Sequence, residues 1–218
     1  MPIPSIPTRG RTLDYAASVY DVLEPLCLFN KQREFDQKII DTLDIKPSDA
    51  LLDLGCGTGL LCDKIARLLE AGQGGSISGI DAAGRMIEAA RSKRGSAKCR
   101  FEAMAAEHLE FADCSFDAVV SSLFFHHLPL DLKEESLREA YRVLKPGGRL
   151  VIADMDRPTT LFGALLSHAS RWVFLQPQIA ENIQGLLPGL IAAAGFADPQ
   201  KVASYFGYLT IFSSDKPL

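Results

Sequence analysis

A short apolar run that leads into a glycine-rich loop constrains the fold of this chain more than any other feature. The run Ala50 to Leu54 reads Ala-Leu-Leu-Asp-Leu, the loop Gly-Cys-Gly-Thr-Gly follows at 55–59, and an amphipathic segment extends from Leu60 to about Glu70. An apolar run bounded by glycines is typical of a buried strand, and the periodicity after it is typical of a helix. We therefore predict a strand, a tight loop and a helix in direct succession.

The same alternation of strands and helices continues along the chain. The apolar patterns predict further strands at 76–80, 99–103, 116–122 and 149–153, and helices at 84–93 and 132–143. A tail at 202–213, rich in aromatic and β-branched residues, predicts two closing strands joined by a hairpin. Apolar strands that alternate with amphipathic helices form a parallel sheet covered on both faces. The expected fold is α/β: a Rossmann-like, doubly wound and mostly parallel sheet of seven strands.

Two regions lie outside this pattern. Apolar residues recur at helical intervals over 14–43, after an opening with prolines at 2, 4 and 7, and predict two helices. In the segment that begins at Arg157, apolar residues from Leu161 to Val173 fall on one helical face, and we expect Phe162, Trp172 and Phe174 to form the core of a helical cap. We expect one domain, with an N-terminal helical lid (1–46), a ligand-binding core (47–156), a helical cap (157–197) and closing strands (198–218).

Charge and cysteine content exclude several kinds of partner. The chain has 23 Lys and Arg against 27 Asp and Glu, a formal charge of −4, which gives no general attraction to nucleic acid or anionic lipid. The five cysteines form no Cys-x-x-Cys pair, the N-terminus does not read as a signal peptide, and no apolar run is long enough to span a bilayer. We expect a soluble cytoplasmic protein, monomer or homodimer, without a metal site, a nucleic-acid partner or stable membrane insertion.

The glycine loop and two acids indicate the kind of ligand. Ligands of a doubly wound sheet lie beyond the carboxyl ends of the strands, where this loop is predicted. Dinucleotide-binding loops read Gly-x-Gly-x-x-Gly, but here the third glycine comes one residue early, at Gly59, and no Gly-Lys-Ser/Thr of a P-loop occurs. Asp53 would repel a pyrophosphate but suits a cation, and Asp81 can accept hydrogen bonds from ribose hydroxyls. A ribose and a cationic group without phosphate describe S-adenosylmethionine.

Several motifs then occur in the order found in one known family. They read LLDLGCGTG at 51–59, GID at 79–81, FD at 116–117, FHHL at 125–128 and RVLKPGG at 142–148. The region from about Ala50 to Asp154 resembles the class I S-adenosylmethionine-dependent methyltransferases. Within them it is most similar to the small-molecule branch that includes the ubiquinone and menaquinone methyltransferases, which are type 11 methyltransferases.

The resemblance implies a set of cofactor-binding residues. It places the backbone of the loop glycines against the methionine part, Asp53 near the amino group and Asp81 on the ribose. The full set it implies is Asp53, Gly55, Cys56, Gly57, Gly59, Asp81, Ala82, Met86, Ala105, Ala106, Glu107, Ser121, Ser122 and Tyr20. Ala105 departs from the family, since many relatives read the exocyclic amine of adenine with an Asp or Asn there. Either the amide of Ala106 suffices, or the cofactor binds less tightly, or the alignment shifts by one residue.

Methyl transfer needs an aligned acceptor rather than a nucleophilic side chain, and its product is S-adenosylhomocysteine. An oxygen or carbon acceptor needs a base, for which His127, His126 and Asp154 are the candidates, while a thiol or amine needs none. The expected activity is methylation of a small, apolar or aromatic metabolite. The alternatives are a non-catalytic S-adenosylmethionine-binding module or subunit, and a nicotinamide reductase. For single residues, Asp81 could instead cap the next helix, and Tyr20 could be a core residue.

Overall fold

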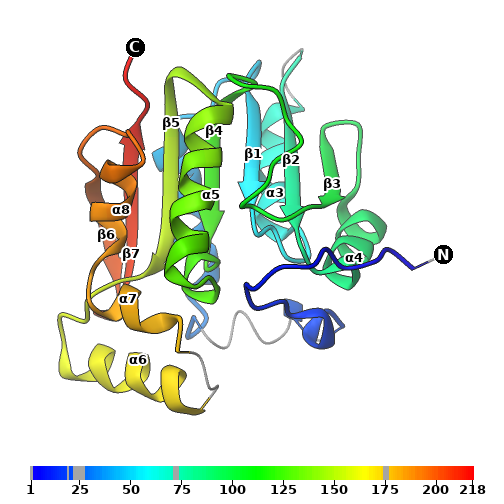
Figure 1. Cartoon of the computed structure of the whole chain (residues 1–218). Coiled ribbons are helices and arrows are strands. Elements are labelled where there is room, and N and C mark those ends of the chain that lie inside the picture. Colours follow the sequence, from blue (N-terminus) through cyan, green and yellow to red (C-terminus); the bar gives the residue numbers. More distant parts are fainter. Residues whose placement is uncertain (1, 19, 22–27, 71–73, 174–176) are drawn as a thin grey trace.

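Seven strands form one sheet in the computed structural model, which describes residues 2–18, 20–21, 28–70, 74–173 and 177–218. The strands are β1 (Ala50–Leu54), β2 (Ser76–Asp81), β3 (Cys99–Ala103), β4 (Phe116–Ser122), β5 (Leu144–Met155), β6 (Gln200–Tyr205) and β7 (Leu209–Asp215). Their order is β3-β2-β1-β4-β5-β7-β6 (Figure 1). Among these strands β7 runs antiparallel to both of its neighbours, and β1 to β5 pair in parallel, which confirms the predicted α/β fold.

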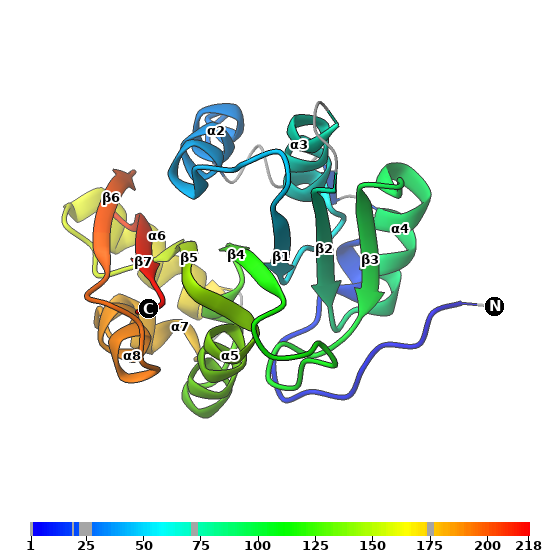
Figure 2. The same ribbon diagram turned by 90° about the horizontal axis from the view of Figure 1, so that it is seen from above.

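Helices cover both faces of the sheet. One face carries α2 (Gln32–Leu43), α3 (Leu60–Leu69) and α4 (Gly84–Arg94), and the other carries α5 (Leu130–Val143) and α8 (Leu187–Ala193) (Figure 2). Side chains of a strand point to opposite faces in turn, so β1 contributes to two cores. Leu51 packs into the core under α2, α3 and α4, and Leu52 and Leu54 pack into the core under α5 and α8.

The order of the strands fixes where a ligand can bind. From β1 the chain proceeds outward to β2 and β3, and then returns to the other side of β1 to form β4 and β5. The loops that follow β1 and β4 therefore diverge at the carboxyl edge of the sheet and leave a crevice between them. The glycine loop after β1 lies at this crevice, as the sequence predicts.

The strand predicted at 149–153 is longer in the structure than expected. β5 begins at Leu144, which pairs with Phe116, and a register shift occurs between Phe116 and Ala118 on the partner strand. We expected Lys145-Pro146-Gly147-Gly148 to end the preceding helix without joining the sheet. The segment instead forms an irregular start to the strand, which is where a proline and a glycine with φ of +73° at Gly147 are tolerated.

The cap differs from the expected packed helix. α6 (Leu161–Val173) is present, but Leu161, Phe162 and Leu165 are exposed, so the expectation that Phe162 lies in a cap core is wrong. The physical reason is that α6 lies beyond the end of the sheet and packs through a narrow face that includes Gly163 and Ser167. The side chains of Trp172 and Phe174 lie outside the described residues.

The N-terminal region also differs from the expected pair of helices. Residues 2–13 form no helix, a 3₁₀ turn follows at Asp14–Ala16, and the second predicted helix is α2. Most of the rest of the first expected helix, residues 22–27, lies outside the described residues. Ile6 N donates to Ala82 O over 2.8 Å and Arg11 N donates to His127 O over 3.0 Å. The N-terminal segment 2–13 thus crosses the carboxyl ends of the strands.

Within the described ranges, no helix combines the length and apolar character needed to cross a bilayer.

Candidate active site

Backbone geometry brings the glycine loop against the end of β2. The amides of Gly55 and Cys56 both donate to Ile80 O, over 2.9 and 2.8 Å. Gly55 has a φ of +74°, and a Cβ there would lie 2.2 Å from the ring of Phe124, so a side chain is excluded. Gly57, with a φ of +53°, leaves a cradle whose nearest neighbour is the ring of Tyr20, 3.6 Å from the position of a Cβ. The loop therefore presents bare backbone toward the crevice.

Asp81 holds this loop from the end of β2. Its Oδ2 accepts a hydrogen bond from Gly57 N over 3.0 Å and its Oδ1 accepts one from Ala83 N over 2.8 Å. Burial raises the pKa of Asp81 to about 6, against the opposing effect of these two amides. Each carboxylate oxygen keeps a second lone pair. Asp81 also lines a pocket together with Ala82 and Met86, and this pocket is the larger of the two that meet at the glycine loop. Asp81 can thus order the turn before α4 and also accept from a diol.

A second pocket adjoins the first on the side of α2 and α3. It is lined by Tyr20, Gln32, Asp36, Asp53, Gly55, Cys56, Gly57, Thr58, Leu60, Leu61 and Ser122. Asp53 Oδ2 accepts from the Cys62 thiol over 3.2 Å, while its buried Oδ1 has no hydrogen-bond partner among the described residues. Burial, with smaller contributions from the charges of Asp81 and Asp36, raises the pKa of Asp53 to about 7. A cationic donor in this pocket would supply the missing partner and favour the ionised carboxylate.

These observations test whether the residues fit S-adenosylmethionine. The unpartnered oxygen of Asp53 suits the α-ammonium group, the cradle at Gly57 suits close approach of the methionine part, and Asp81 suits the ribose. A buried carboxylate that lacks a partner is costly unless a ligand satisfies it. The chemistry of this donor set therefore fits the cofactor at both ends.

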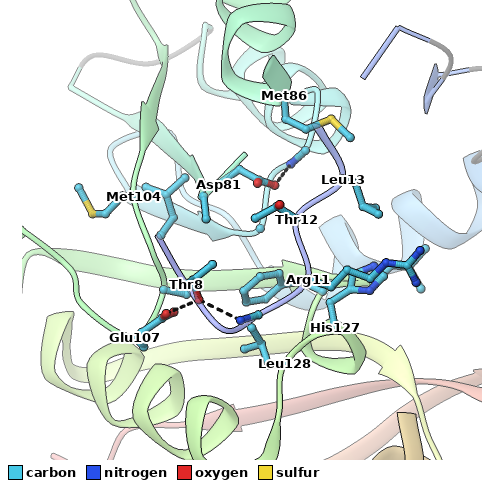
Figure 3. A pocket seen from close by; sticks show the side chains of 18 of the residues that line it. Thr8, Arg11, Thr12, Leu13, Asp81, Met86, Met104, Glu107, His127 and Leu128 are labelled. Carbon is cyan, nitrogen blue, oxygen red and sulfur yellow. Dashed lines mark hydrogen bonds between the residues drawn. The ribbon is translucent and has the colours of Figure 1, made fainter. Parts of the chain in front are cut away.

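Residues of the N-terminal segment line the end of the larger pocket where the resemblance places adenine. Thr8 Oγ1 donates to the carboxylate of Glu107, and both line the pocket with Met104 and Ala106 (Figure 3). Thr12 and Leu13 also line the pocket. No pattern in the sequence beyond the spaced prolines indicates these contacts, because the segment reaches the site through tertiary packing.

Some residues that the family resemblance implies lie outside these pockets. A Cβ on Gly59 would lie 2.4 Å from the ring of Phe101, so this glycine allows α3 to pack against β3. Ser121 is fully buried and donates to Leu54 O over 2.9 Å, which links β4 to β1. Ala105 is buried and lines neither pocket, whereas Ala106 and Glu107 line the larger one. Their functions as cofactor contacts remain predictions.

The end of β5 and the turn after β4 form a carboxylate–histidine pair. His126 Nδ1 lies 2.7 Å from Asp154 Oδ1, and the Asp154 side chain is fully buried. Asp154 also accepts from the amides of Phe124 and Met155, over 3.0 and 2.6 Å, so its position is fixed. In the neutral imidazole, a carboxylate that accepts from Nδ1–H selects the tautomer in which Nε2 carries the lone pair and faces away from the carboxylate. The sequence offers His126, His127 and Asp154 as separate candidates for a base, and the structure brings His126 and Asp154 together.

His127 occupies a different environment. It lines the larger pocket, its ring centroid lies 4.0 Å from that of His126, and its Nδ1 is buried without a partner among the described residues. Burial, followed by the charges of His126 and Arg11, holds the pKa of His127 well below its usual value. His127 is therefore a neutral residue of the pocket wall.

The raised pKa of Asp53 predicts a pH dependence of cofactor binding. The cation prefers the ionised carboxylate, so we expect the Kd for S-adenosylmethionine to fall about tenfold as pH rises from about 6 to about 8. The stability of the ligand-free protein should change in the opposite direction. Because the pKa of Asp53 is raised in the folded state, the free energy of unfolding should fall as the pH rises from the ordinary carboxyl pKa to about 7. Isothermal titration calorimetry measures the binding. Asp53→Asn should bind with a Kd that changes much less with pH, and an equal change in both proteins would contradict this origin.

Known proteins share this fold and these motifs. Residues 52–152 match the family model described as "Methyltransferase domain". A ubiquinone/menaquinone biosynthesis C-methyltransferase of Geotalea daltonii is 27% identical over 93% of this chain and 94% of its own length. A demethylmenaquinone methyltransferase of Desulfitobacterium hafniense is 33% identical over 68% of this chain, which spans 58% of that relative. The solved structure of an S-adenosylmethionine-dependent methyltransferase from Aquifex aeolicus superimposes with a TM-score of 0.71 at 19% identity, over 94% of this chain and 99% of that one.

The fold, the motifs and these similarities define the class: the protein is an S-adenosylmethionine-dependent methyltransferase with a Rossmann-like fold. More particularly, the chain resembles the class I methyltransferases, and among them the UbiE-type quinone C-methyltransferases.

Proposed function

We propose that this enzyme transfers a methyl group to an oxygen or carbon atom of a small apolar or aromatic acceptor. The observation that carries the proposal is the contact of 2.7 Å between His126 Nδ1 and the buried Asp154 Oδ1. A phenol, hydroxyl or activated carbon needs a base to expose its electron pair, whereas a thiol or amine needs none. The oriented imidazole of His126 lies against His127, which lines the larger pocket, and this position supports the first group of acceptors.

The residues around the pair support an apolar acceptor. Leu123, Phe124 and Leu128 line the larger pocket on the side of His127. Relatives named as ubiquinone/menaquinone and demethylmenaquinone methyltransferases make an aromatic quinol a suitable first member of this class. Acceptors with a charged headgroup are less suited to such a wall.

Each residue then has a defined task. The bound cofactor supplies the electrophilic methyl group. Asp53 and the backbone at Gly57 bind its methionine end, and Asp81 binds its ribose. His126 Nε2 accepts the proton of the acceptor while Asp154 holds the ring and stabilises the imidazolium that forms. The N-terminal segment 2–13 lies over the pocket and excludes water from it.

A panel of acceptors tests the proposal. We expect formation of S-adenosylhomocysteine with at least one phenol, catechol or demethylated quinol, the last with a short side chain, and a methylated product by mass spectrometry. Thiols and amines serve as the contrasting arm. Turnover restricted to thiols or amines would overturn the assignment of a base, and tight binding of S-adenosylmethionine without turnover on the whole panel would favour the non-catalytic alternative.

A further inference from the structure

A second carboxylate lines the larger pocket on the side away from His127. Among the described residues that line this pocket, the acids are Asp81 and Glu107. Glu107 belongs to the loop after β3 and lies on the side of Met104, with His127 on the opposite side (Figure 3). The pocket thus has one carboxylate where the ribose is expected and another beyond that position.

Hydrogen bonds fix the backbone of the loop that carries Glu107. His108 N donates to Ala105 O over 3.1 Å and closes a turn that contains Glu107. Directly after this turn, Leu109 N donates to Glu139 Oε2 of α5 over 2.8 Å, so the loop is attached to a helix of the core. The position of Glu107 beside the pocket is therefore set by the fold before a ligand binds.

Thr8 of the N-terminal segment orients the side chain of Glu107. Thr8 Oγ1 donates its proton to Glu107 Oε1 and accepts a hydrogen bond from Gly10 N over 3.1 Å. A hydroxyl has a single proton to donate, so the proton of Thr8 is committed to Glu107. An ionised carboxylate has about four lone-pair sites, and this contact uses one of them. The pair therefore offers a ligand acceptors rather than donors.

Apolar side chains line the pocket on the same side as Glu107. They are Ala82, Met86, Met104 and Ala106. S-adenosylmethionine joins its methionine, ribose and base in that order, so a cofactor with its methionine end at Gly57 and its ribose at Asp81 extends its base beyond Asp81. The faces of a purine are apolar and its edge carries the polar groups, which suits apolar walls with one polar side chain at the end. Glu107 is in the position to meet that edge.

We propose that Glu107, oriented by Thr8, binds the exocyclic amine of the cofactor's adenine and selects adenine over a base with a carbonyl oxygen at that position. The amine offers two N–H donors and the carboxylate only accepts, whereas a carbonyl oxygen would set an acceptor against an acceptor. Ala105 has no polar side chain and lines neither pocket, so Glu107 supplies the acid that this chain lacks at position 105. The inference rests on the placement of the ribose at Asp81 and is independent of the methyl acceptor.

Calorimetric titration with two nucleosides tests the proposal. S-adenosylhomocysteine carries the amine, and S-inosylhomocysteine carries a carbonyl oxygen in its place. We expect the wild-type protein to bind the adenosine compound about 30-fold more tightly, because the inosine compound leaves the carboxylate without its donor. Glu107→Gln should narrow this ratio to below about fivefold, since a carboxamide can both donate and accept. Thr8→Val, which removes the hydroxyl that orients Glu107, should give a ratio between these two values.

Two variants serve as controls for this ratio. Glu110→Gln makes the same change three residues further along, at an exposed side chain that does not line the pocket, and should keep the wild-type ratio. Asp81→Ala should weaken both nucleosides by similar factors and leave their ratio unchanged, because both carry the same ribose. A change in the ratio is therefore specific to the group that binds the base.

Three outcomes would overturn the proposal. The first is a wild-type protein that binds the two nucleosides equally well or binds neither, and the second is a Glu107→Gln variant that keeps the wild-type ratio. The third is an unchanged ratio in Thr8→Val, which would show that Thr8 does not orient the carboxylate. No methyl acceptor takes part in the titration, so an acceptor panel without turnover would contradict the proposed function and leave this ratio as expected.

Discussion

Replacing Asp154 with asparagine is expected to lower kcat for methyl transfer by about 10²–10³-fold, because a positioned base contributes an effect of this size. The asparagine amide cannot accept at both oxygen positions, although His126 Nδ1 and the amides of Phe124 and Met155 all donate there. The imidazole then loses the carboxylate that selects its tautomer and stabilises the imidazolium formed in the reaction. The measurement is single-turnover methylation of the acceptor found in the panel, with saturating cofactor.

Further variants separate a base from a merely structural contact. His126→Ala should be as slow as Asp154→Asn and should regain part of its rate when free imidazole is added. The variant that combines Asp154→Asn with His126→Ala should be no slower than His126→Ala alone, since Asp154 acts through His126. His108→Ala, which removes an exposed histidine, is the matched control and should keep the wild-type rate. An unchanged kcat in His126→Ala would refute the assignment of this residue as the base.

Replacing Asp81 with alanine is expected to raise the Kd for S-adenosylmethionine by about 10–100-fold. The variant loses the charge-assisted acceptors for the ribose, and it also leaves Gly57 N and Ala83 N without the carboxylate that orders the loop. Calorimetric titration measures the change. The Kd for methylthioadenosine, which keeps the ribose but lacks the amino acid, should rise by a similar factor.

Two comparisons give this result its meaning. Asp53→Asn should weaken S-adenosylmethionine more than methylthioadenosine, because we propose that Asp53 binds the methionine end of the cofactor. Asp117→Ala is the matched control: Asp117 also accepts from a backbone amide, Ala50 N over 2.9 Å, but lies at the amino end of the strands. Its removal can lower the free energy of unfolding but should leave the Kd unchanged. An unchanged Kd in Asp81→Ala would mean that Asp81 only orders the turn before α4.

The strands and helices of the core follow from local pattern. The apolar runs at 50–54 and 116–122 coincide with β1 and β4, and the helix predicted at 84–93 is α4 within one residue. These segments are predictable because each must bury a continuous apolar face, which leaves a periodic record in the sequence. The start of β5 was missed because a bulge that contains Pro146 and Gly147 reads locally as a turn.

The sequence also predicts the positions of the expected cofactor-binding residues near the loop. The positions of Gly55, Gly57 and Asp81 follow from a strand, a tight turn and a neighbouring parallel strand, and all three line the larger pocket. The function of Gly59 was less apparent, because close packing against Phe101 and close approach to a ligand both demand glycine. The sequence alone does not distinguish these two demands.

The sheet, its covering helices and the acids that flank the glycine loop can thus be predicted from the chain alone, since they depend on periodicity and on neighbours along the chain. Three features become visible only in the folded molecule: Asp154 reaches His126, Thr8 reaches Glu107, and Leu161 and Leu165 of α6 are exposed. Contacts between distant segments, and the side of a helix that finds a partner, depend on how elements pack in space rather than on the order of residues.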